Sequence, residues 1–204
     1  MKKNKKFIYL ISPKKILTTD FYKNLEKIFK TKKIFFFQLR LKKENQQNII
    51  KIAKKIKKLT KKYNVKFIIN DNPEMSVKLN ADGCHIGQKD FNIKKARKIL
   101  KNKILGVTCH NSIKLARKAI ENKADYLAFG SFYKSTTKKA KYKAKIKILH
   151  SVKKITKVPI VAIGGINLNN YKKLLLNNAN FLAISGYIWN NKKYKPLEAI
   201  EKLK

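Results

Sequence analysis

The sequence predicts an α/β protein folded as a closed (β/α)8 barrel, and three observations favour this fold. Short apolar runs typical of buried parallel strands alternate with amphipathic segments typical of helices. Eight such alternations fit into the 204 residues. No GxGxxG motif follows the first run, which argues against the runner-up, an open doubly wound sheet. We therefore expect a single barrel domain with short loops over residues 1–204.

The expected strands are rich in β-branched and aromatic residues and are bounded by polar or turn-forming residues. Because helical segments separate them, we expect the strands to pair in parallel through right-handed crossovers. In chain order the strands are expected at Phe7–Ile11, Ile34–Leu39, Phe67–Asn70, Gly83–Ile86, Ile104–Thr108, Tyr126–Phe129, Ile160–Ile163 and Phe181–Ile184.

The clearest expected helix is Gln46–Lys62, where apolar residues recur at helical spacing and lysines fill the opposite face. Three further helices are expected at Ser112–Asn122, Asn169–Asn178 and Pro196–Leu203. The serine that opens the first of these can cap it, and the proline that opens the last suits a first helical turn.

The composition is strongly basic, with 51 Lys and Arg against 11 Asp and Glu and a formal net charge of +40. Such a charge first suggests a nucleic acid or an anionic membrane as partner. However, only Arg40, Arg97 and Arg117 are arginines, the side chain that nucleic-acid readers favour, and the lysines are spread from Lys2 to Lys204. We expect no specific nucleic-acid partner, and keep a lysine-rich nonspecific nucleic-acid-binding protein as one alternative.

The same charge would draw small phosphorylated molecules towards any cleft. No apolar run is long enough to cross a bilayer, and no cleavage site follows the basic start of the chain. The two cysteines, Cys84 and Cys109, predict no disulfide framework. We therefore expect a cytoplasmic protein without a membrane partner, and leave open whether it forms a homo-oligomer.

Polar residues follow the third and fourth expected strands, at the barrel end where such folds carry their chemistry. Asn70 and Asp71 end the third strand, and Asp90 lies just beyond the fourth. Two carboxylates and an amide predict a Mg²⁺ site completed by substrate phosphate. The alternative is that the carboxylates cap loops or pair with lysines. Asp82 is interpreted as a turn residue.

Other strand ends offer groups suited to anions. Arg40 and Lys42 lie two positions apart, so both can point to one side, and with Gln38 they suit a diphosphate. Glycines and serines follow strands seven and eight, where many barrels bind phosphate. The segment 135–138 adds hydroxyls and an ammonium on a loop that could close over a substrate. Ordinary tight turns are the alternative.

Histidine and cysteine chemistry is not favoured. The three histidines lack zinc-ligand spacing, and His85 is interpreted as a hydrogen-bonded core residue. Cys109 lacks a base that would activate it as a nucleophile.

Five segments resemble the thiamine-phosphate synthase and thiazole tautomerase superfamily, over roughly residues 7 to 188. They are Gln38–Lys42, Ile69–Asp71, Ala81–Asp90, Thr137-Lys138 and Ala162–Ile166. The third is the most specific because it is long and rare. The resemblance implies a (β/α)8 barrel and a synthase reaction. In it, 4-amino-2-methyl-5-(diphosphooxymethyl)pyrimidine and 4-methyl-5-(2-phosphoethyl)thiazole give thiamine phosphate and diphosphate by a Mg²⁺-dependent dissociative substitution. A thiazole tautomerase, with His110 as its candidate base, or a non-catalytic relative is the alternative.

The resemblance also implies roles for individual residues. Asp71 and Asp90 correspond to the metal ligands, and Lys138, Arg40 and Lys42 to the groups that act on the departing charge. The implied pyrimidine-diphosphate contacts are Gln38, Arg40, Lys42, Asn70, Thr108 and Lys138. The implied thiazole-phosphate contacts are Ser135, Thr136, Thr137, Gly165, Ile184 and Ser185.

Three positions depart from the pattern of the superfamily. Asn72 stands where an arginine is common, Ser131 replaces a usual proline, and Ser135 replaces a usual threonine. The loop after Lys138 is short and lacks the usual glycine. These departures concern loop closure and thiazole binding, and leave the implied metal ligands and diphosphate lysines in place.

Overall fold

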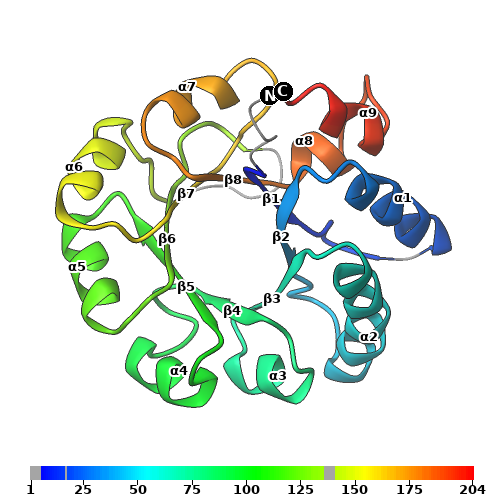
Figure 1. The fold of residues 1–204 in the computed structure, drawn as a ribbon, viewed down its shortest axis with the longest axis horizontal. Coiled ribbons are helices and arrows are strands. Elements are labelled where there is room, and N and C mark those ends of the chain that lie inside the picture. Colours follow the sequence, from blue (N-terminus) through cyan, green and yellow to red (C-terminus); the bar gives the residue numbers. More distant parts are fainter. Residues whose placement is uncertain (1–5, 17, 136–140) are drawn as a thin grey trace.

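Eight parallel strands close into a barrel in a computed structural model that describes residues 6–16, 18–135 and 141–204 (Figure 1). Each strand pairs with its neighbours in chain order, and β8 pairs back with β1. The strands are β1 Ile8–Ile11, β2 Ile34–Leu39, β3 Lys66–Asn70, β4 Gly83–Ile86, β5 Ile104–His110, β6 Tyr126–Gly130, β7 Ile160–Ile163 and β8 Phe181–Ile184. The predicted (β/α)8 barrel is confirmed.

Helices surround the barrel and follow the strands one by one (Figure 1). They are α1 Thr19–Lys30, α2 Gln46–Lys62, α3 Pro73–Lys78, α4 Ile93–Leu100, α5 Ile113–Glu121, α6 Lys147–Ile155, α7 Tyr171–Leu176, α8 Gly186–Trp189 and α9 Pro196–Glu201. Helix α2 has the bounds that its periodicity predicts. Helices α7 and α9 end earlier than predicted, after six residues each.

Asparagine and serine side chains begin four of these helices by accepting a backbone N–H of the first turn, which offsets one of its unpaired donors. The four capping residues are Asn45, Asn72, Asn92 and Ser112. Asn72 is the residue that stands where the superfamily commonly has arginine, and its Oδ1 accepts the Met75 N–H at 2.8 Å. In this chain the position therefore fixes the start of α3.

The core has two parts, because successive side chains of a strand point to opposite faces. The larger part lies between the strands and the helices and contains residues such as Leu10, Phe37 and Ile69. The smaller part contains Tyr9, Ile11, Phe36, Ile68, Tyr126, Ala128, Val161 and Ala183, all buried. These alternate with the first set and fill the inside of the barrel, so the barrel is packed and is not an open channel.

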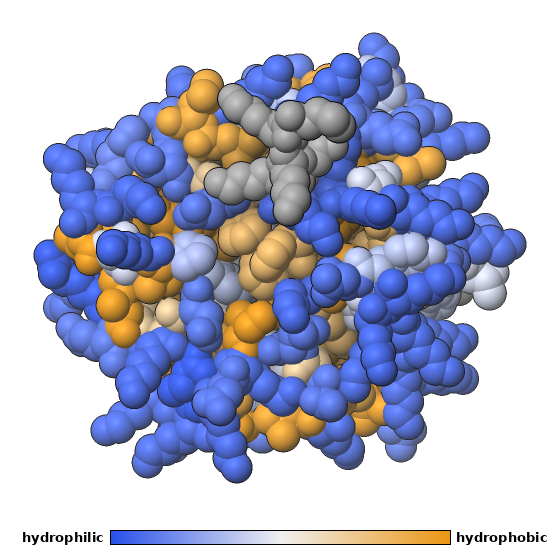
Figure 2. All heavy atoms as spheres, in the orientation of Figure 1, coloured by the Kyte–Doolittle hydropathy of each residue, from blue (hydrophilic) through white to orange (hydrophobic). Residues whose placement is uncertain are grey.

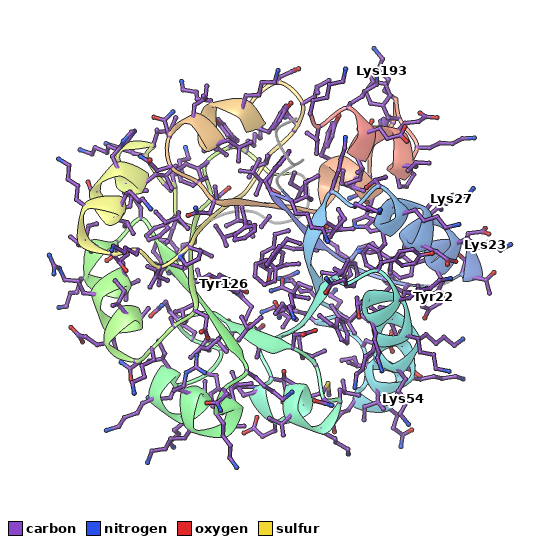
Figure 3. The ribbon with its side chains drawn as sticks, in the orientation of Figure 1. Tyr22, Lys23, Lys27, Lys54, Tyr126 and Lys193 are labelled. Carbon is purple, nitrogen blue, oxygen red and sulfur yellow. The ribbon has the colours of Figure 1, made fainter. Side chains whose placement is uncertain are left out.

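Lysines point outward from the helices, as Lys23 and Lys27 on α1 and Lys54 on α2 show, and Lys193 does so from the loop between α8 and α9 (Figure 3). Hydrophilic residues cover most of the face seen in Figure 2, with hydrophobic residues visible between them and near the middle. No helix within the described ranges is long and apolar enough to cross a membrane.

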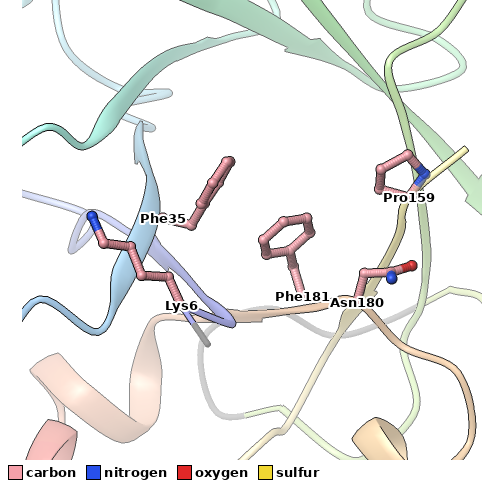
Figure 4. A pocket seen from close by; sticks show the side chains of 5 residues that line it. All are labelled: Lys6, Phe35, Pro159, Asn180 and Phe181. Carbon is pink, nitrogen blue, oxygen red and sulfur yellow. The ribbon is translucent and has the colours of Figure 1, made fainter. Parts of the chain in front are cut away.

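An apolar pocket of about 380 Å³ opens at the amino-terminal ends of the strands (Figure 4). Its lining residues lie just before or at the start of their strands: Lys6, Phe35, Pro159, Asn180 and Phe181. The polar residues that the sequence singles out lie at the opposite, carboxyl-terminal ends. Chemistry in barrels of this kind occurs at the carboxyl-terminal ends, so we assign the pocket no part in it.

Candidate active site at the carboxyl-terminal ends of the strands

Two aspartates from neighbouring strands converge on one lysine. Lys42 Nζ lies 2.8 Å from Asp71 Oδ2 and 3.2 Å from Asp90 Oδ1. Lys42 follows β2, Asp71 directly follows β3, and Asp90 follows β4. Because these three strands are consecutive in the barrel, residues 48 positions apart in the sequence meet at one edge.

Asp71 is held in an unusual backbone conformation. Its φ of 62° is in the left-handed region, and its N–H donates to the His85 carbonyl at 2.7 Å. Burial raises the pKa of the Asp71 carboxyl, and the charge of Asp90 adds to this, while Lys42 and Asn70 act in the opposite direction. A carboxylate whose burial is only partly offset gains from further positive charge beside it.

Lys42 responds to the same arrangement with the opposite shift. Partial burial lowers the pKa of its ammonium, but the hydrogen bonds and charges of Asp71 and Asp90 outweigh burial, and the pKa is raised overall. The lysine therefore stays charged and neutralises part of the acidic pair.

A glycine allows the Asp90 carboxylate to reach this position. A Cβ atom at Gly87 would collide with Asp90 Oδ2, and Asp90 N–H donates to the Gly87 carbonyl at 3.3 Å. The turn 87–90 thus folds the aspartate back over a residue without a side chain. The same loop is tied to β5, because Gln88 Nε2 donates to the Thr108 carbonyl.

The acidic pair suits a hard divalent cation. Asp71 and Asp90 offer carboxylate oxygens, and a protein ammonium already lies between them. No group of three or more His, Cys, Asp or Glu side chains with metal-binding geometry occurs in the described ranges. A cation here would therefore take two protein carboxylates and complete its shell with water or phosphate oxygens, the pattern that Mg²⁺ favours.

Arg40 is positioned by a residue that sequence reasoning did not single out. The Arg40 N–H donates to Ser12 Oγ at 3.0 Å, and the Ser12 N–H donates to the Gln38 carbonyl at 2.9 Å. Ser12 is buried and directly follows β1. The position of Ser12 directly after an expected strand is the feature of the sequence that could have singled it out.

A chain of hydrogen bonds crosses the inside of the barrel. Gln38 Nε2 lies 3.0 Å from Tyr9 Oη, which lies 2.7 Å from Tyr126 Oη. Tyr126 Oη lies 3.0 Å from His85 Nδ1, and His85 Nε2 lies 2.9 Å from Thr108 Oγ1. The chain joins five strands and ends at two of the residues implied to contact the pyrimidine.

Burial decides the protonation of this chain. It lowers the pKa of His85 to about 4 and raises the pKa of Tyr9 and Tyr126 above their usual range. The ring of His85 is therefore neutral near pH 7, and both tyrosines keep their protons. The sequence predicts His85 as a hydrogen-bonded core residue, but it does not single out Tyr9 or Tyr126.

Three of the residues implied to bind the thiazole phosphate, Gly165, Ile184 and Ser185, lie at the ends of β7 and β8. Gly165 has a φ of 63°, and a Cβ there would collide with the Lys134 carbonyl. Ile184 is buried, and Ser185 Oγ donates to the Ser12 carbonyl at 3.2 Å. Ser135 is the last described residue before a gap, and Thr136, Thr137 and Lys138 lie outside the described residues.

Three other residues that the sequence analysis considers, Asp82, Cys109 and His110, make contacts within the fold. Asp82 accepts the Phe67 N–H at 2.8 Å and pairs with Lys66 at 3.3 Å, which fits its interpretation as a turn residue. Cys109 is buried, and burial raises the pKa of its thiol to about 12, so it is not an activated nucleophile. The ring of His110 stacks on Tyr142 with centroids 4.1 Å apart.

Comparison with known proteins identifies the family. The model of the family described as "Thiamine monophosphate synthase" matches residues 8–188. A thiamine-phosphate synthase from Pelagibacter ubique (strain HTCC1062) is 69% identical over 201 residues, covering 98% of this chain and 97% of that protein. A thiamine-phosphate synthase from Rhodospirillum centenum is 36% identical over 185 residues, covering 90% and 89%.

Solved structures agree on the fold. A thiamine phosphate pyrophosphorylase from Pyrococcus furiosus superposes with a TM-score of 0.85 at 24% identity, covering 98% of this chain and 94% of that one. A 3-hexulose-6-phosphate synthase superposes with a TM-score of 0.66 at 16% identity, covering 96% and 98%. At these identities the likeness concerns the barrel alone. The match over residues 8–188 and the 69% identity along nearly the whole chain show that it belongs to the thiamine monophosphate synthase family and has thiamine-phosphate synthase activity.

Proposed function

We propose that this transferase joins a pyrimidine diphosphate to a thiazole phosphate at the carboxyl-terminal rim of its barrel, releasing diphosphate. The observation that carries the proposal is the meeting of Asp71 and Asp90 on Lys42, within the strand ends that also hold Gln38 and Arg40. A departing polyanion needs positive charge fixed in place before it leaves, and this edge of the barrel offers such charge.

The metal site in this proposal consists of Asp71 and Asp90. Mg²⁺ bound there would neutralise charge on the diphosphate as it leaves. Arg40 offers a planar fork that can hold two phosphate oxygens, and Lys42 offers a compact charge between the two carboxylates. Lys138, which the structure does not describe, is the third cation assigned to this charge.

The pyrimidine ring in this proposal lies over the inside of the barrel, against Gln38, Asn70 and Thr108. Gln38 is buried, and Asn70 and Thr108 are half-buried. Below them lie Tyr9, Phe36 and Tyr126, which fill the barrel. A dissociative reaction forms a pyrimidine cation that water would trap, so a packed floor that keeps water away supports this placement.

The thiazole phosphate is assigned to the ends of β6, β7 and β8. Its proposed contacts are Ser135, Thr136, Thr137, Gly165, Ile184 and Ser185. The segment before the gap lies against the end of β7, because the Tyr133 N–H donates to the Gly164 carbonyl at 3.0 Å. This contact supports placing the following hydroxyls beside Gly165. We also infer that the enzyme works in the cytoplasm, which fits its two unpaired thiols.

Two measurements on the purified protein test this proposal. The first is formation of thiamine phosphate and diphosphate from both substrates, with Mg²⁺ and with excess chelator. The second is a thermal shift with inorganic diphosphate, with and without Mg²⁺, because a ligand that binds only the folded state stabilises it. We expect turnover and a diphosphate-dependent shift only with Mg²⁺. Turnover that persists after complete chelation would refute the metal site.

A further inference from the structure

The chain of hydrogen bonds inside the barrel contains three residues whose polar groups have no role in the proposed reaction. Tyr9, Tyr126 and His85 lie between Gln38 at one end and Thr108 at the other. Tyr126 extends from β6 into the barrel (Figure 3). The two tyrosines are almost fully buried. A buried polar group that loses its partner is costly, so the members of such a chain hold one another in place.

The donors and acceptors of the chain can be assigned one after another. Gln38 Nε2 can only donate, so Tyr9 Oη accepts from it and gives its single proton to Tyr126. Tyr126 then gives its own proton to His85 Nδ1. A neutral imidazole that accepts at Nδ1 carries its proton on Nε2, so His85 donates to Thr108 Oγ1.

The assignment fixes what each end offers to a ligand. The Gln38 amide uses its nitrogen on Tyr9, and its Oε1 accepts no hydrogen bond from the described residues. Thr108 Oγ1 accepts from His85, and its own proton has no acceptor in the described part of the chain. One end of the chain therefore offers a carbonyl acceptor, and the other offers a hydroxyl donor.

Only one other assignment of donors and acceptors gives every residue of the chain its hydrogen bonds. If the Gln38 amide were turned over, each donor would become an acceptor and His85 would carry its proton on Nδ1. Gln38 would then offer an N–H donor and Thr108 an acceptor. An aminopyrimidine has an exocyclic N–H donor and ring-nitrogen acceptors. With its amino group at Gln38 and a ring nitrogen at Thr108, the orientation that this inference assigns to it, the first arrangement matches it, whereas the reversed one would set donor against donor at Gln38.

We propose that Tyr9, Tyr126 and His85 are positioning residues that fix the direction of this chain, so that Gln38 accepts from and Thr108 donates to the aminopyrimidine substrate. The proposal rests on the proposed function for the placement of that substrate. The packing supports it independently. The ring of His85 stacks on Tyr126 with centroids 5.6 Å apart, and Tyr9 meets Tyr126 edge-on at 5.7 Å. Gly106 leaves room for Tyr126, because a Cβ there would collide with the tyrosine hydroxyl.

The first test is steady-state kinetics of Tyr126→Phe. Without this hydroxyl nothing donates to His85 Nδ1, so both tautomers form and the Thr108 proton can turn inward. We expect KM for the pyrimidine diphosphate to rise about tenfold, as for the loss of one buried hydrogen bond, with KM for the thiazole phosphate unchanged. Tyr171→Phe is the matched control, because Tyr171 is buried and donates to the Lys204 carbonyl at 2.8 Å, away from the barrel interior. It should alter neither KM.

The second test needs no substrate. The side-chain ¹⁵N signals of His85, assigned by their loss in His85→Gln, report which ring nitrogen carries the proton. We expect the proton on Nε2 in the wild type and in Tyr9→Phe, and a mixture of tautomers in Tyr126→Phe. Tyr9→Phe should still raise KM for the pyrimidine diphosphate, because it frees the Gln38 amide. If Tyr126→Phe fails to fold, Tyr9→Phe and the wild-type spectrum decide the outcome.

The proposal is overturned by a proton on Nδ1 in the wild type, or by equal changes in both KM values. A Tyr126→Phe variant with both KM values unchanged overturns it as well. If the purified enzyme formed no thiamine phosphate, the proposed function would fail, while the histidine signals alone would still confirm or refute the direction of the chain.

Discussion

Asp71 combines three properties that few side chains in this protein share. Its backbone is left-handed, its carboxylate is partly buried, and it meets a lysine that also contacts Asp90. The strand that precedes Asp71 and the turn that follows it restrict its backbone. The carboxylate is therefore already ordered before a ligand binds. Pre-organised charge of this kind is effective at a reacting centre.

Asp71→Ala should lower kcat/KM by roughly a hundredfold or more while leaving the fold intact, because it removes a proposed metal ligand and leaves the Lys42 charge less balanced. The measurement is initial rate over a range of Mg²⁺ concentrations, with melting temperature as the check on folding. Asp20→Ala, at an exposed position in the first turn of α1, is the matched control and should behave as the wild type. Equal activity of Asp71→Ala would remove Asp71 from the site.

Lys138→Ala should reduce kcat more than it raises either KM, if the lysine acts mainly on charge that builds up as diphosphate leaves. Lys141→Ala is the control from the same loop, because Lys141 is exposed. A variant with a raised KM and an unchanged kcat would show that Lys138 binds the ground state and the transition state equally and does not act on the departing charge.

His85 makes stability depend on pH in a known direction. Its pKa is about 4 in the folded protein and near the ordinary 6.5 when unfolded, so the unfolded state binds more protons between these values. The free energy of unfolding should therefore fall as pH drops from 6.5 to 4, by at most about 3 kcal/mol from this residue. Urea denaturation across this range should show a shallower decline in His85→Gln. Parallel curves for the two proteins would contradict the shift.

At the scale of elements, glycines decide how closely strands and loops approach. Gly106 on β5 leaves the space that the ring of Tyr126 on β6 occupies, and Gly87 leaves the space for the Asp90 carboxylate. Neither glycine contributes chemistry. Both allow a neighbouring polar group to lie where a side chain would exclude it.

Gly106→Ala should destabilise the fold by about 1–3 kcal/mol, because the added methyl group overpacks the barrel interior against Tyr126. The measurement is the urea midpoint, compared with Tyr126→Leu and with the double variant. The two substitutions should not be additive, because the smaller leucine leaves room for the methyl group. Strict additivity would mean that Gly106 and Tyr126 do not compete for the same space.

The elements themselves were predictable because their signals are local. Helix α2 has its predicted bounds, and the cap at Ser112 marks the start of α5. The apolar pattern alone predicts no bounds for α1, α3, α4, α6 or α8, although the alternation requires a helix after each strand. Helix α7 begins later than its apolar pattern predicts, because Asn167 and Asn170 bond to each other in a turn first.

The site was predictable only in part. Asp71, Asp90 and Lys42 follow strand ends, so barrel geometry alone predicts that they meet. Tyr9, Tyr126 and Ser12 could not be singled out in the same way. Inward-facing aromatic residues fit an ordinary core, and their polar role arises from contacts between residues as far apart as 117 positions. Local patterns carry no information about such contacts.

At the scale of the whole molecule, charge is poorly balanced. The described residues form five ion pairs, while the full chain carries 51 Lys and Arg. Most lysines therefore repel one another across the outer helices, and the same field attracts anions to the rim. Salt weakens both effects, since it screens charges on the surface.

Added NaCl at constant Mg²⁺ should therefore raise the melting temperature and also raise KM for both phosphorylated substrates, with a smaller change in kcat. The measurements are thermal unfolding and initial rates over one salt series. KCl should act like NaCl, because screening depends on ionic strength. A melting temperature that stays constant or falls with salt would mean that lysine repulsion does not limit stability.

The packed interior of the barrel has a kinetic consequence. Tyr9, Phe36, Ile68 and Tyr126 block the axis, so the apolar pocket at one mouth has no passage to the rim at the other. At the proposed site, both substrates and both products therefore enter and leave through the carboxyl-terminal mouth of the barrel. The substrate that binds second would then block release of the first, which favours an ordered sequence of substrate binding and product release over a random one.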